Sequence, residues 1–181
     1  RSLQGGIVGH LSVMSRHAMS DVMKDERAGR ASAQIDHILT RFHDTHRREL
    51  PELQAKANAL EALGLGPGLG AEVQAMAQAL ERHMFKEEMR LFPMMAQGGN
   101  TLIGHLIEDL QIDHVEHGDV LGALQARLDG LRAEPAAEPA LAALRQAFAK
   151  FSADLREHAR TEDELLFPLF EPRQEPLLSR P

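Results

Sequence analysis

The chain has 181 residues, no cysteine and a formal net charge of −7 at pH 7. This length can bury one hydrophobic core without disulfide bonds, and without thiolates any metal must be held by nitrogen and oxygen donors. An acidic chain without a tract of Lys and Arg argues against nucleic-acid binding, and no run of 18 uncharged apolar residues predicts a membrane span. We therefore expect a cytoplasmic protein with neither nucleic-acid nor membrane partners.

The first 30 residues are interpreted as an N-terminal extension. Apolar residues at helical spacing between residues 7 and 22 allow a fifth helix that would lie on the main domain. The charged stretch 25–30 predicts a break between this helix and the main domain. The role of this extension is left open by the sequence.

Four longer helices follow, separated by glycine and proline. Apolar residues recur along each at spacings of three and four, and Trp and Tyr are absent. Pro51 predicts a kink or a short break in the first of them. The predicted helices cover residues 32–63, 71–96, 101–131 and 139–172. The sequence therefore predicts an all-α fold, an antiparallel up-down four-helix bundle over residues 31–172, followed by a tail at 173–181.

One short phrase occurs twice in these helices. A histidine is followed four residues later by a glutamate and then by Leu-Phe-Pro, once from His83 and Glu87 and again from His158 and Glu162. A spacing of four places both side chains on the same helical face. In both copies that face is the apolar stripe, so the sequence predicts that the pairs point inward. The Leu-Phe-Pro triplets are assigned to packing.

The two preceding helices each place a histidine on their own stripe, at His43 and His114. An ionised glutamate in an apolar core is unfavourable unless it is paired or bound to a cation. Four imidazoles and two carboxylates could form the inner shell of two cations, with both carboxylates bridging, and this donor set favours Fe, Mn or Zn. The predicted metal ligands are His43, His83, Glu87, His114, His158 and Glu162.

Six other histidines are less informative. His46 and His117 each follow a predicted ligand by three residues, which places them about 60° round the helix, at the edge of the stripe. They are candidates for a further ligand or a supporting group, although a position on the helix surface is the simpler expectation. The remaining four lie off the stripes and are expected to face solvent: His10, His17, His37 and His105.

These motifs, between about residues 35 and 170, resemble the hemerythrin-like HHE cation-binding domain. The narrower resemblance is to the repair-of-iron-centres di-iron family, which is associated with nitric oxide and oxidative stress. It rests on four segments: residues 36–53, 83–95, 113–118 and the second copy of the repeated phrase. The resemblance implies two non-haem iron ions, four histidines as terminal ligands, and Glu87 and Glu162 as bridges.

Two departures from the family pattern stand out. Members often begin with a small domain that bears a Cys-Cys pair, which this chain lacks. Some members and the oxygen-carrying hemerythrins use at least a fifth histidine, but no histidine lies between Arg47 and Arg82. One iron could therefore keep an open position or recruit another donor.

Three functions compete on this basis. The favoured one is a di-iron protein of the nitrosative and oxidative stress response that binds nitric oxide, or reacts with it as an oxidoreductase, or supplies iron to damaged iron–sulfur proteins. The second is a carrier of dioxygen or iron without turnover, and the third is a regulatory bundle whose metal is structural. No residue beyond the six ligands is an obvious acid or base, so no catalytic residue is assigned.

Overall fold

A computed structural model describes residues 7–170 and, within that range, the side chains of Met19 and of residues 22–170. This part of the chain is helical and contains no strand. Its elements, in chain order, are α1 (Ile7–Ile38), η1 (Leu39–His43), α2 (Asp44–Ala62), α3 (Leu69–Lys86), η2 (Glu87–Leu91), α4 (Phe92–Ala96), α5 (Ile103–Gly130), α6 (Glu138–Thr161), η3 (Glu162–Leu166) and η4 (Phe167–Leu169).

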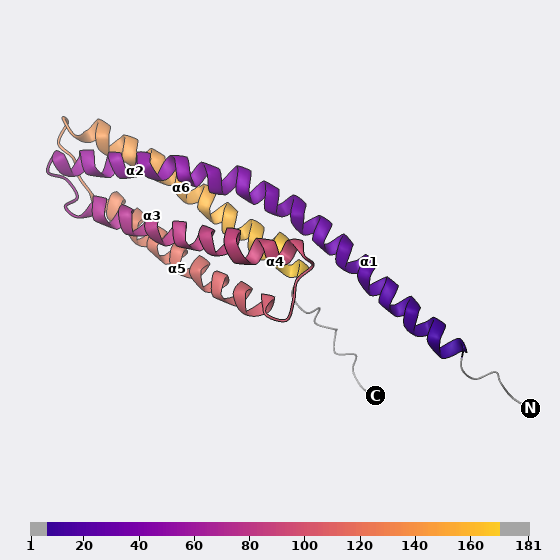
Figure 1. Ribbon diagram of the computed structural model, residues 1–181. Helices are drawn as coiled ribbons and strands as arrows, with labels where there is room; N and C mark the ends of the chain where they lie inside the picture. The colour runs from indigo at the N-terminus through magenta and orange to yellow at the C-terminus, as the bar shows by residue number, and fades with distance from the viewer. Residues whose placement is uncertain (1–6, 171–181) are drawn as a thin grey trace, which may run out of the picture.

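The elements join into four long rods, which Figure 1 shows side by side. The first rod is α1, η1 and α2, the second is α3, η2 and α4, the third is α5, and the fourth is α6 with η3 and η4. Helix α2 packs against α3 and α6, and α5 packs against the same two helices. The predicted four-helix bundle is confirmed. None of the described helices is long and apolar enough to cross a membrane.

The N-terminal region differs from the expectation. The predicted break at residues 25–30 is wrong, because α1 continues through this stretch and extends beyond the bundle (Figure 1). Charged residues such as Glu and Arg are good helix formers, and the single Gly29 costs only about 1 kcal/mol. Where its side chains are described, most of the extension is exposed, with Met19 65% and Val22 57% exposed, and only Arg27 and Ala28 are half-buried. Residues 1–6 and the predicted tail at 173–181 lie outside the described range.

The first rod also passes Pro51 without a break, because α2 is continuous from Asp44 to Ala62. The irregularity lies upstream, in the single π turn η1, where the backbone N–H of Asp44 donates to the carbonyl of Leu39. The break that the sequence allowed at Pro51 is therefore absent.

Glycines end the first two rods. At the end of α2 the N–H of Leu65 donates to Leu60 O (3.2 Å) and that of Gly64 to Glu61 O (2.8 Å), with Gly64 at φ +80°. This hydrogen-bond pattern is a Schellman motif, which requires a left-handed residue. The end of α4 repeats it at Gly98, at φ +87°. These turns reverse the chain and place neighbouring rods antiparallel.

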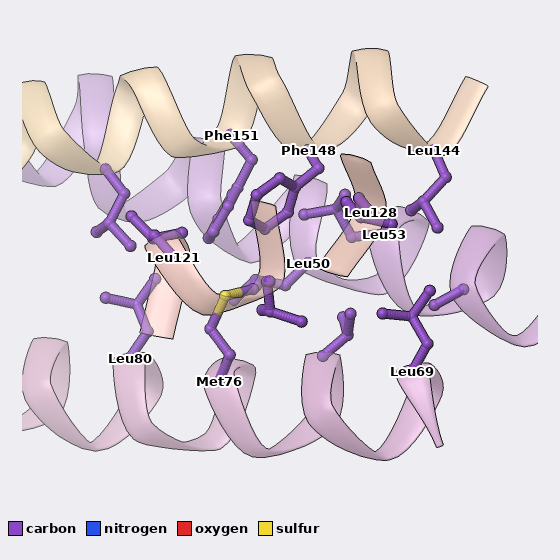
Figure 2. Packing of buried hydrophobic residues seen from close by; sticks show 14 of the residues in the cluster. Leu50, Leu53, Leu69, Met76, Leu80, Leu121, Leu128, Leu144, Phe148 and Phe151 are labelled. Atoms are coloured by element: carbon purple, nitrogen blue, oxygen red, sulfur yellow. The ribbon is translucent and has the colours of Figure 1, made fainter. Parts of the chain in front are cut away.

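Two apolar clusters fill the bundle. The first lies between α2, α3, α5 and α6 and includes Phe148 and Phe151, which point between the helices in Figure 2. The second joins α1, η1, α4 and α5 to η3 and η4, around Phe42 and Phe167. On the second rod the buried polar residues His83 and Glu87 lie between Leu80 of the first cluster and Leu91 of the second, so the polar site lies between two apolar cores.

Candidate metal centre

The structure brings all six predicted ligands together between the two cores. Five of them are at most 2% exposed, and the side chain of His114 is 7% exposed. Their donor atoms form two overlapping groups in which all atoms lie within 4.8 Å of one another. One group is His43, Glu87, His158 and Glu162, and the other is His83, Glu87, His114 and Glu162. We refer to them as the His43/His158 position and the His83/His114 position.

Both glutamates lie between the two positions. Glu87 places Oε2 3.2 Å from His43 Nε2 and Oε1 3.4 Å from His83 Nε2. Glu162 places Oε1 3.1 Å from His158 Nε2 and Oε2 3.0 Å from His114 Nε2. Each carboxylate therefore offers one oxygen to each position, which is the arrangement that a bridging ligand requires.

The spacing of the donor atoms suits metal coordination, and some of these atoms lack hydrogen bonds of their own. Two donors that bind one cation at about 2.1 Å are separated by about 3 to 3.5 Å, and His43 Nε2 lies 3.2 Å from His158 Nε2. Both oxygens of Glu87 are buried without a hydrogen-bond partner among the described residues. A buried carboxylate without partners is strongly unfavourable. A cation at each position would satisfy it.

Three further carboxylates support the histidine rings from behind. The Nδ1 atom of His43 lies 2.7 Å from Glu88 Oε1, that of His83 3.2 Å from Asp113 Oδ2, and that of His114 3.1 Å from Asp163 Oδ1. In a metal-bound ring such a contact holds the proton on Nδ1 and leaves Nε2 to the metal.

Surface cations hold two of these carboxylates in place. Arg47 donates to Glu88 at 2.8 Å, and Lys86 donates to Asp113 at 2.8 Å. Hydrogen bonds from His83 and then Lys86 keep the pKa of Asp113 well below its usual range. These carboxylates were not predicted from the sequence, although Glu88, Asp113 and Asp163 each adjoin a predicted ligand in the chain.

Three of the four rods carry a π turn at the site. His43 is the last residue of η1, while Glu87 and Glu162 are the first residues of η2 and η3. π turns are rare and occur frequently at functional sites. These turns were not predicted from the sequence. The available signal was a proline two residues beyond the turn, at Pro93 and Pro168.

The two glutamates differ in the metal-free protein. Burial, reinforced by the charge of Glu162, raises the pKa of Glu87. Burial opposes ionisation of Glu162 as well, but His158, His114 and His83 outweigh it and lower the pKa of Glu162. The carboxyl group of Glu87 therefore favours its protonated form, and a bound cation would displace that proton. Glu162 is already ionised.

His46 and His117 are buried, at 0% and 8% exposure, so the expectation that they lie on the helix surface is wrong. A helix stripe is wide enough for a position about 60° from its centre to remain covered by the next helix. Their rings lie 5.3 Å from that of His158 and 5.1 Å from that of His83, centroid to centroid. Neither belongs to the two donor groups.

Of the other four histidines, two have described side chains. His37 and His105 are exposed, as expected. The side chains of His10 and His17 lie outside the described residues.

Buried histidines predict acid sensitivity in the metal-free protein. Burial and then His158 lower the pKa of His43 to about 4 and that of His46 to about 3, from 6.5. Burial and then His83 lower the pKa of His117 to about 4. Between pH 6.5 and 4 the unfolded chain binds more protons at these three groups, so stability falls as pH falls. We expect the free energy of unfolding to decrease by up to about 4 kcal/mol per pH unit below pH 6. Urea unfolding of metal-free protein at pH 7, 6 and 5 measures this slope.

His114 has the opposite effect on the pH dependence of stability. Burial alone would lower its pKa, but hydrogen bonds to Asp163 and Glu162 raise the pKa to about 9. Its contribution is complete below pH 6.5 and is lost as pH rises through 9. The metal-free protein should therefore be most stable near neutral pH. Replacing the exposed His105 by Gln should not change the acid slope, and a flat profile between pH 7 and 5 would contradict the prediction.

A small cavity reaches the site between α5 and α6. Its volume is about 40 Å³, and the rings of His83, His114, His117 and His158 form part of its wall. Gly118 and Arg156, which are exposed, also line it. A water molecule occupies about 30 Å³ in the liquid. The cavity therefore has room for a small molecule beside the histidine rings.

Comparison with known proteins agrees with this geometry. The family model described as hemerythrin HHE cation binding domain matches residues 34–170. Similar curated proteins include the iron-sulfur cluster repair protein YtfE of Salmonella schwarzengrund, 32% identical over 160 residues, and that of Citrobacter koseri, 31% identical over 160 residues. Each of these comparisons covers 86% of the chain and 73% of the relative.

Proposed function

Because the chain belongs to the hemerythrin HHE cation-binding domain family, we propose that it is a non-haem di-iron protein of the nitrosative and oxidative stress response. It binds nitric oxide or supplies iron for the repair of iron–sulfur clusters. The observation that carries this proposal is the placement of Glu87 and Glu162, each with one oxygen beside each position. Two ions bridged by carboxylates require one carboxylate oxygen beside each ion.

The six side chains would hold the two ions as four terminal imidazoles and two bridging carboxylates. Iron bound there supplies one-electron redox chemistry and an exchangeable position for a small diatomic ligand. The protein contributes a fixed shell, since the carboxylates behind His43, His83 and His114 lock these rings in one orientation. The two apolar cores on either side limit access of water.

The repair role is supported by the relatives, whose printed name is iron-sulfur cluster repair protein. Iron–sulfur proteins are then the partners that receive iron. Nitric oxide binding is supported by the cavity between α5 and α6, which suits a diatomic molecule such as nitric oxide or dioxygen.

Anaerobic loading with ferrous iron tests the proposal. Two irons per chain and new nitrosyl absorption bands after addition of nitric oxide are expected, together with cluster formation when the loaded protein is mixed with a cluster-free iron–sulfur protein. A stable, reversible spectrum with dioxygen and no iron transfer would instead indicate a carrier. Preferential binding of zinc without any spectral response would contradict the proposal and indicate a structural metal.

The cavity makes one specific prediction. A Cβ atom on Gly118 would meet nothing within 4 Å, and Gly118 lines the cavity, so Gly118→Leu should place its side chain at the opening of the cavity. We expect nitric oxide to associate at least about tenfold more slowly, a change of about 1.4 kcal/mol in the barrier. Stopped-flow absorption of the ferrous protein measures the rate.

The matched control is Gly122→Leu. This position lies one turn further along α5, is equally open and does not line the cavity. Both variants should bind as much iron as the parent protein. Equal association rates for the two variants would show that small ligands do not use this cavity.

A further inference from the structure

The four histidine rings of the site are not supported equally. His43, His83 and His114 each place Nδ1 against a carboxylate, at 2.7, 3.2 and 3.1 Å. The Nδ1 atom of His158 is buried and has no hydrogen-bond partner among the described residues. This difference is not visible in the repeated sequence phrase, in which His83 and His158 occupy the same place.

The surroundings of His158 explain the difference. Phe42 stacks on its ring at 5.2 Å with an interplanar angle of 11°, and His46 lies 5.3 Å away. Both nitrogens of His46 are themselves buried without a partner within the described part of the chain. On its Nδ1 side the ring of His158 is therefore fixed by packing and not by an acceptor, although its Nε2 lies 3.1 Å from Glu162 Oε1.

A carboxylate behind a ligating imidazole affects how tightly the metal is held. It orients the ring and makes the bound nitrogen more basic, and loss of such a partner typically costs about 10 to 100-fold in metal affinity. At the His83/His114 position both rings have this support. At the His43/His158 position only His43 has it, through Glu88.

We propose that the two metal positions are inequivalent, and that the His43/His158 position is the one that gives up its iron to an acceptor while the His83/His114 position retains its iron. This inference rests on the proposed di-iron function and specifies which half of the site acts as the donor. The bridging glutamates touch both positions and so do not distinguish them. The difference lies in the carboxylates behind the rings.

Two matched variants separate the positions. Glu88 and Asp113 each contact one histidine ring of the site and one surface cation, Arg47 or Lys86. Glu88→Gln and Asp113→Asn preserve size and leave a weaker, neutral acceptor. The first removes the only carboxylate support of the His43/His158 position, and the second removes half of the support of the other position.

The experiment is an equilibrium titration of the anaerobic, fully loaded protein with a ferrous chelator, with the iron remaining per chain as readout. The parent protein should lose its irons in two steps separated by about 10 to 100-fold in free iron concentration. Glu88→Gln should widen this separation by shifting the first step. Asp113→Asn should narrow it by shifting the second step. Full loading at excess iron shows that each variant is folded.

Opposite effects of the two variants are the result that a general loss of stability would not produce. Release of both irons of the parent protein in a single step, or the same shift in both variants, would overturn the inequivalence and leave the di-iron function intact. A parent protein that binds only one iron at saturation would overturn the di-iron function, and this inference with it.

Discussion

Replacing Glu87 by Leu is expected to remove iron binding at both positions and at the same time to stabilise the metal-free protein. The side chain offers one oxygen to each position, so its loss should weaken both sites by more than the roughly 10 to 100-fold that a supporting group costs. Without a cation, both of its buried oxygens lack a hydrogen bond among the described residues. An apolar residue of similar size should therefore raise the free energy of unfolding by about 1 to 3 kcal/mol.

Glu162 provides the contrasting case. Its loss should also remove iron, since it lies between the same two positions. In the metal-free protein, however, its oxygens accept hydrogen bonds from His158 and His114. Glu162→Leu would leave those rings without a partner and should lower the free energy of unfolding by about 1 to 3 kcal/mol. The two variants share one effect on metal and have opposite effects on stability.

Iron analysis and urea unfolding of the metal-free variants measure both effects. Glu164→Leu is the control, because Glu164 lies on the same π turn as Glu162 and is exposed. It should retain the iron content and stability of the parent protein. Two irons in the Glu87 variant would refute a bridging role for that residue.

The prediction of the bundle succeeded because its signals are local. Apolar stripes with a period near 3.6 mark the helix faces, and glycines that need positive φ, such as Gly64 and Gly98, mark their ends. The resemblance to the HHE domain is confirmed by the family match over residues 34–170. The break before residue 31 was wrong because charge alone does not end a helix whose residues favour it.

The parts of the candidate site that lie on a single helix face could be predicted from the sequence. A spacing of four shows that His83 and Glu87 share a face, and the same holds for His158 and Glu162. Contacts between helices carry no such signal. Asp113 supports His83 from another helix, and that pairing depends on how the rods are aligned. The π turns shift this alignment locally, and single-sequence periodicity does not detect them.

The lack of support behind His158 likewise appears only in three dimensions. In sequence, the phrase around His158 repeats the phrase around His83, which suggests a symmetric pair. The fold places Asp113 behind one ring and Phe42 against the other. A duplicated motif therefore produces two positions with the same ligands and different support.

The position of the site between two cores leads to a final prediction, that Phe148→Ala will destabilise the protein strongly without removing its metal ligands. Phe148 is 1% exposed and belongs to the cluster between α2, α3, α5 and α6 (Figure 2). Truncation of a buried Phe costs about 3 to 5 kcal/mol, the sum of lost burial and a cavity. Thermal or urea unfolding of the metal-free protein measures this loss. Phe85→Ala, at a site 58% exposed on α3, should change stability by less than about 0.5 kcal/mol.

Iron should recover a large part of that loss. The six ligands lie outside the damaged cluster, and a ligand that binds only the folded state adds about 2.7 kcal/mol at 100 times its dissociation constant. The Phe148 variant should therefore gain about as much stability from saturating ferrous iron as the parent protein does. A much smaller gain would mean that the space left by the missing Phe148 ring disturbs the ligands, and that this core helps to hold them in place. An equal gain would show that the site is held by its own helix turns and by the carboxylates behind its rings.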